Sequence, residues 1–134
     1  MKRLFAICLV LSLLALSGCA FFGNDAEAGG ESSTTSEIVG TWETIIPMDL
    51  GAGTLNYSFT VTYSLNGTGR ETLSYAPLNW SMSVNFTWSA SNGRVTITSE
   101  EDGVTTTTTV RYGVVGDALT TYARGTTRTL NRVR

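Results

Sequence analysis

The stretch LNYSFTVTYSL at residues 55–65 alternates apolar and polar side chains over eleven residues, and WSMSVNFTW at residues 80–88 repeats the pattern. Successive side chains of a β-strand point to opposite faces, so a period of two buries one face of a sheet and leaves the other in water. After Ile38, no segment of ten residues has the spacing of an amphipathic helix. Both stretches predict strands of an all-β domain.

Turn signals divide the rest of the domain at short intervals, at Asn66-Gly67, Asn92-Gly93, Asp102-Gly103, Gly116-Asp117 and Gly125. They delimit eight predicted strands, near residues 39–46, 54–65, 68–75, 80–90, 94–99, 104–114, 118–123 and 127–133. The run Thr105–Thr109 is read as strand because threonine favours strands. A sequential antiparallel meander removes its edges by closing, so we predict an eight-stranded up-and-down barrel, with a two-sheet β-sandwich as the alternative.

The N-terminus has the layout of a secretory signal. Lys2 and Arg3 precede an apolar run of 13 residues from Leu4 to Leu16, which is shorter than the roughly 20 residues of a membrane-spanning helix. Leu16-Ser17-Gly18-Cys19 then resembles the lipobox of bacterial lipoproteins. The resemblance implies a signal peptide at residues 1–18 and a lipidated Cys19, with acyl chains that anchor the protein stably to a membrane. A buried helix and an ordinary secretory signal are the alternatives.

Residues 20–37 are rich in Gly, Ser, Thr, Ala and acidic residues and contain no Lys or Arg. This composition predicts a flexible tether, so residues 19–37 would link the lipid to a domain at residues 38–134. The resemblance to lipoproteins implies a location in the cell envelope. Ala20 rather than Asp after the cysteine favours the outer membrane where the organism has one.

The composition excludes several classes of function. Removal of Lys2 and Arg3 leaves seven arginines against eleven acidic residues, a formal charge of −4, which argues against nucleic acid as a partner. The chain has no His, and Cys19 would be the only cysteine of the mature protein. A metal site, a cofactor and an enzyme are therefore not expected.

Gly40-Thr41-Trp42 resembles the Gly-x-Trp signature of lipocalins, and residues 39–133 look like the short lipocalin-like domains of bacterial lipoproteins. The matching motifs lie in the family's order and include Asn66-Gly67-Thr68-Gly69, Phe86-Thr87-Trp88 and Arg132-Val133. The resemblance implies that Arg132 stacks on the Trp42 indole, and adjacency of the first and last strands in a closed meander supports this contact. The domain is shorter than a full lipocalin and lacks the helix that follows the barrel, which weighs against a deep ligand cup.

Strand direction predicts which loops share an end of the barrel. The connections at residues 47–53 and 76–79 fall at the end opposite Trp42, which would be the mouth. Interior positions nearest this mouth, and thus candidate ligand contacts, are Tyr57, Tyr75, Trp80 and Met82. Aromatic rings of this kind either line an apolar pocket or fill the barrel.

Three charged features have both a structural and a functional interpretation. Glu71 is expected to point inward and pair with Arg132, with a ligand contact or solvent exposure as alternatives. Residues 100–103 (EEDG) form a solvated acidic turn or a weak cation site. The C-terminal arginines serve solubility or bind an anionic partner; they are Arg111, Arg124, Arg128, Arg132 and Arg134.

The sequence predicts a lipid-anchored binding module that takes up a small apolar or amphiphilic molecule at the barrel mouth. The alternative is an envelope interaction protein or inhibitor, with a filled barrel that contacts a protein or polysaccharide. A pocket among the candidate ligand contacts would favour the first, and a filled interior beside an exposed apolar patch would favour the second.

Overall fold

The computed structural model describes residues 35–123 and 125–134. The predicted signal peptide at residues 1–18, the lipidated Cys19, most of the tether and Arg124 lie outside these residues. Within the described ranges, no helix has the length and apolar character needed to cross a membrane.

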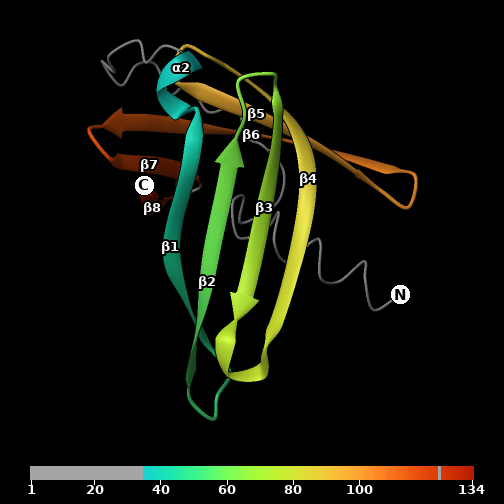
Figure 1. Cartoon of the computed structure of the whole chain (residues 1–134), viewed down its shortest axis with the longest axis vertical. Helices are drawn as coiled ribbons and strands as arrows, with labels where there is room; N and C mark the ends of the chain where they lie inside the picture. The colour runs from blue at the N-terminus through green and yellow to red at the C-terminus, as the bar shows by residue number, and fades with distance from the viewer. Residues whose placement is uncertain (1–34, 124) are drawn as a thin grey trace.

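The described chain forms a closed antiparallel barrel in which each of eight strands pairs with the next in sequence and the first pairs with the last. This confirms the predicted up-and-down barrel. The strands are β1 (Gly40–Asp49), β2 (Thr54–Tyr63), β3 (Thr68–Tyr75), β4 (Trp80–Ser91), β5 (Arg94–Glu101), β6 (Val104–Val115), β7 (Ala118–Ala123) and β8 (Thr126–Arg132). In Figure 1, β1 to β4 run together along the long axis and the β5–β6 hairpin crosses them.

The two-residue alternation places one set of side chains in the barrel interior. On β2, Phe59, Val61 and Tyr63 are buried, whereas the intervening Thr60 and Thr62 are more exposed. The same pattern on the other strands completes the core with Trp42, Leu73, Phe86, Trp88, Val95, Ile97, Val110, Tyr112, Leu119 and Leu130. The closed part of the barrel is therefore packed with large side chains.

The barrel closes over a short length. β1 pairs with β8 at Trp42–Arg132 and Glu43–Asn131, and the Val133 N–H donates to the Thr41 carbonyl at 2.8 Å. β4 pairs with β5 through residues 87–91, whereas its pairing with β3 covers residues 80–87. The strands are thus joined all round at the Trp42 end, and β1 to β4 extend beyond this closed part (Figure 1).

Two local features differ from the sequence prediction. A short helix, α2 (Thr35–Ile38), precedes β1, and it includes residues expected to belong to the tether. Its Ile38 is fully buried in the core, which explains why the turn is ordered against the barrel. β1 also continues through Pro47 to Asp49. Proline lacks an N–H but is tolerated there because this part of β1 pairs with β2 alone among the described strands.

Two strand glycines provide a matched test of the packing. An added Cβ at Gly69 on β3 would overlap the Phe86 ring and lie 2.7 Å from the Thr62 carbonyl oxygen, whereas at Gly113 on β6 it would meet nothing within 4 Å. We expect Gly69→Ala to lower the free energy of unfolding by about 1–3 kcal/mol because a packed interior resists added volume. Gly113→Ala should change it little. Urea unfolding of both variants measures this, and equal effects would contradict the packing described for Gly69.

Candidate functional site

Three of the four predicted ligand contacts form an aromatic cluster at the end of the barrel opposite the closure. The Tyr57 ring on β2 lies 5.1 Å from the Tyr75 ring on β3 and 6.2 Å from the Trp80 ring on β4, measured between centroids. The contact with Trp80 is edge to face, at 86° between the ring planes. Such pairs add roughly 0.5–1.5 kcal/mol beyond the burial of their area.

Backbone register explains why these rings meet. Tyr75 and Trp80 are directly paired across β3 and β4, and Tyr57 lies opposite Ile46 on β1. The connection between Tyr75 and Trp80 is a single 3-10 turn, Ala76–Leu78, which has Pro77 near its start. It ends at Asn79, whose left-handed backbone (φ 48°) is a conformation that Asn tolerates better than most residues.

The cluster is open to solvent on one side. Trp80 is 41% exposed, and Leu50 and Leu78, on the two connections at this end, are 61% and 75% exposed. Tyr57 and the fourth candidate, Met82, are partly buried and pack against the core. This end therefore presents aromatic and aliphatic surface to solvent, with a flexible thioether below it.

Below the cluster, bulky side chains occupy the barrel interior. Phe59 and Leu73 are fully buried one step further along β2 and β3, and they pair directly across the two strands. Tyr63, Phe86 and Trp88 then pack together with ring centroids 5.3–5.6 Å from Tyr63. This arrangement suits a shallow apolar contact site at the open end rather than a deep cup.

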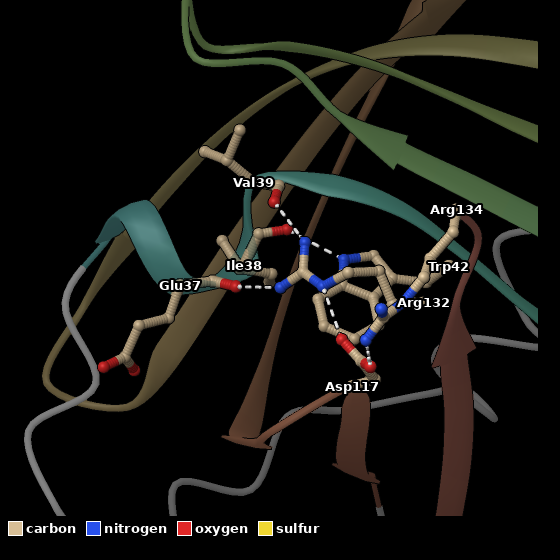
Figure 2. A network of polar contacts seen from close by, with 7 residues as sticks. All are labelled: Glu37, Ile38, Val39, Trp42, Asp117, Arg132 and Arg134. Carbon is tan, nitrogen blue, oxygen red and sulfur yellow. Dashed lines mark hydrogen bonds and ion pairs between the residues drawn. The ribbon is translucent and has the colours of Figure 1, made fainter.

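The opposite end is held by Arg132, as Figure 2 shows. Its guanidinium carbon lies 4.1 Å from the centre of the Trp42 ring. The same group donates to the carbonyl of Val39 at 3.0 Å and to that of Glu37 at 3.2 Å. The structure thus places the two residues of the expected stacking contact together, and Arg132 also links β8 to the turn that precedes β1.

Gly40 is the third member of this arrangement. Its φ of 140° is one that residues with a Cβ rarely adopt, and an added Cβ would overlap the Arg132 guanidinium. Trp42 in turn donates its indole N–H to the Ile38 carbonyl at 2.9 Å. In the Gly-x-Trp sequence, Gly40 therefore leaves room for the Arg132 guanidinium, and Trp42 provides the aromatic ring on which it stacks.

The acidic partner of Arg132 is Asp117, and the predicted pairing of Arg132 with Glu71 is wrong. Asp117 Oδ1 lies 3.5 Å from Arg132 Nε, and its other oxygen pairs with Arg134 (Figure 2). Asp117 lies in the turn after β6, which the direction of the strands assigns to the Trp42 end. Strand direction could therefore have identified Asp117 as the partner of Arg132. An exposed carboxylate can pair with Arg132 without the free-energy cost of burial.

Glu71 instead lies in the interior of the barrel without a polar partner. It is fully buried, and neither carboxylate oxygen has a hydrogen-bond partner among the described residues. Burial raises the pKa of Glu71 to about 8, so the side chain is mainly neutral at pH 7. Burial and the nearby Glu71 also raise the pKa of Tyr63. The buried hydroxyl of Tyr112 similarly lacks a partner within the described part of the chain.

The other charged features do not assemble into a site in the described part of the chain. Asp102 and Gly103 form the tight turn between β5 and β6, both with positive φ. Arg111 lies over the Tyr122 ring, with its guanidinium carbon 5.5 Å from the ring centre. Among the described residues, no group of three or more His, Cys, Asp and Glu is arranged to hold a metal ion.

Comparison of the chain with known proteins found no matching family model, no similar curated protein and no similar solved structure. The barrel itself is shown by the structure. The relationship to lipocalin-like lipoproteins stays a prediction from the motifs.

The buried Glu71 is expected to make the free energy of unfolding depend on pH. Folded Glu71 keeps its proton up to about pH 8, whereas the unfolded chain releases it near pH 4.5. This group therefore makes the free energy of unfolding fall as pH rises between these values, by at most about 1.4 kcal/mol per pH unit. Glu71→Gln should reduce that slope because the amide does not titrate. Denaturant unfolding from pH 4 to 8 measures it.

Glu43→Gln is the control, because Glu43 is exposed on the outer face of β1. It should leave the pH dependence of stability close to that of the parent. A parental slope retained in Glu71→Gln would show that Glu71 is ionised in the folded protein.

Proposed function

We propose that this protein is a lipid-anchored lipoprotein of the cell envelope that binds a small apolar or amphiphilic molecule at the open end of its barrel. The aromatic cluster of Tyr57, Tyr75 and Trp80 is the observation that carries the proposal. An apolar tail would lie against these rings and Met82, and a polar head would remain in water.

The position of the cluster is consistent with an anchor on the N-terminal side. β1 begins at Gly40, at the closed end, and reaches the level of Tyr57 at Ile46. Six strand residues span roughly 20 Å. A lipid attached at Cys19 would therefore leave the open end facing away from the membrane, toward the periplasm or the cell exterior.

A second function is favoured by the exposed side chains around the same end. Leu50, Leu78 and Trp80 would also suit an envelope protein or polysaccharide that docks against the barrel, and the filled interior would then serve as a rigid support. The two functions differ in the size of the ligand and in whether the ligand must reach Met82.

A titration with an environment-sensitive fatty-acid probe separates them. The fragment 35–134 keeps α2 and is the suitable soluble protein, after refolding to remove carried ligand. We expect saturable binding with quenching of tryptophan fluorescence, and Met82→Trp should weaken it at least tenfold because the larger ring would occupy the position proposed for the apolar tail. Probe fluorescence gives the affinity of each variant.

Ser81→Trp is the matched control for Met82→Trp. It adds the same ring one residue away on β4, at an exposed position of the outer face, so it should leave probe affinity near the parental value. Unchanged affinity in Met82→Trp would rule out this ligand site. A folded parent that binds no probe would favour the docking function.

The lipid anchor has its own test. Cys19→Ala should abolish incorporation of labelled palmitate in a bacterial host and release the protein from the membrane fraction, because the thioether forms on that thiol. Cys8→Ala is the control and should retain label and membrane association. Labelling that persists without Cys19 would contradict the lipoprotein assignment.

A further inference from the structure

β6 pairs with β5 over its first part and with β7 over its last part. β5 pairs with β6 from Val104 to Arg111, whereas β7 pairs with it from Arg111 to Val115. On the β7 side, no described strand pairs with residues 104–110. In Figure 1, the tip of the β5–β6 hairpin projects to the side away from β7.

This free edge lacks the features by which proteins usually prevent strand pairing. Residues 104–110 have the sequence VTTTTTV, which contains no charge, no proline and no glycine. Val104 is 58% exposed, and four of the five threonines are also exposed. A regular, uncharged edge of β-branched residues is a template for a further strand.

We propose that this edge pairs with the same edge of a second copy of the chain, antiparallel and with Thr107 on a two-fold axis. The sequence VTTTTTV reads the same in both directions, so a two-fold axis at Thr107 places Val104 beside Val110 of the other copy. Thr105 then faces Thr109 of the other copy, and Thr107 faces its own equivalent. Opposed residues of an antiparallel pair share a face, so the inner faces of both sheets become continuous.

The threonines on the outer face already form cross-strand pairs within one copy. The hydroxyls of Thr96 and Thr109 lie 2.9 Å apart, and those of Thr98 and Thr107 lie 3.2 Å apart. The proposed dimer continues both rows across the axis. Thr–Thr pairs of this kind stabilise neighbouring strands.

Charge favours the same register. Glu100 and Glu101 end β5 and Asp102 follows in the hairpin turn, next to Val104, whereas Arg111 follows Val110 at the other end of the free edge. Opposing Val104 to Val110 brings the acidic turn of one copy toward Arg111 of the other, twice per dimer. Opposite charges at the ends of the paired segment oppose slipping of the register.

Seven residues per chain bury less surface than a permanent dimer requires. We therefore expect a reversible dimer whose population rises with protein concentration. This association is independent of the proposed ligand site, because the edge of β6 and the aromatic cluster lie on different strands.

Disulfide trapping in the full chain tests the pairing directly. Thr107→Cys places two thiols opposite each other at a spacing that a disulfide can bridge. Mild oxidation should give at least tenfold more disulfide-linked dimer than for Thr98→Cys, which lies on the same outer face but one strand further from the axis. The parent chain reports any dimer formed through Cys8 or Cys19. Equal trapping in both variants would overturn the proposal.

Charged residues introduced at positions 105 and 109 test the register of the proposed dimer without cysteine chemistry. The variant with both Thr105→Lys and Thr109→Lys opposes like charges and should raise the dissociation constant at least tenfold, a factor worth about 1.4 kcal/mol. Thr105→Lys with Thr109→Glu opposes unlike charges and should restore dimerisation. Sedimentation equilibrium of the full chain in detergent measures both. A parent that is monomeric at all concentrations, or a lysine pair that dimerises like the parent, would overturn the proposal.

Discussion

β1 and β8 pair through two residue pairs, so backbone pairing alone closes the barrel weakly. Side chains supply the rest of the closure. Arg132 packs over the Trp42 indole and donates to carbonyls of the segment before β1, and Asp117 neutralises part of its charge. Hydrogen bonds to a charged group contribute about 1.5–3 kcal/mol, more than ordinary backbone pairs. The closed end depends on this one guanidinium because it joins the last strand, which carries it, to the first strand and to the turn at Asp117.

The two ends of the barrel consequently differ in their chemistry. At the closed end, Arg132 and Trp42 both donate to backbone carbonyls, and Trp42 is fully buried. At the other end, β1 to β4 extend past the closure and present Trp80 and Leu78 to solvent. A site that must exchange an apolar molecule with water is better placed where the apolar surface is already accessible, because binding there requires no opening of a packed core.

Alternation and turn residues were enough to predict the strands and their order, because each strand has one buried face and each hairpin has a strong turn signal. The end of β1 was predicted too early, since Pro47 reads as a breaker unless the missing neighbour on one side is known. α2 is a single turn, too short for a periodic signal, and it is held by Ile38 and Arg132. Alternation places Glu71 inside the barrel at the level of Trp42, which favours it as the partner of Arg132, whereas the actual partner Asp117 lies outside the barrel in a turn.

The pairing of β1 with β8 also determines when the barrel can close relative to synthesis and export of the chain. Arg132 contacts Val39 across 93 positions of sequence, so the ring of strands stays open until β8 has been synthesised. Long-range pairing of this kind is slow to form. For a protein that is exported as proposed, this order is useful, because translocation requires an unfolded chain and the barrel cannot close before β8 is available to pair with β1. The 93-residue separation of the closing contact thus favours passage through the membrane before folding.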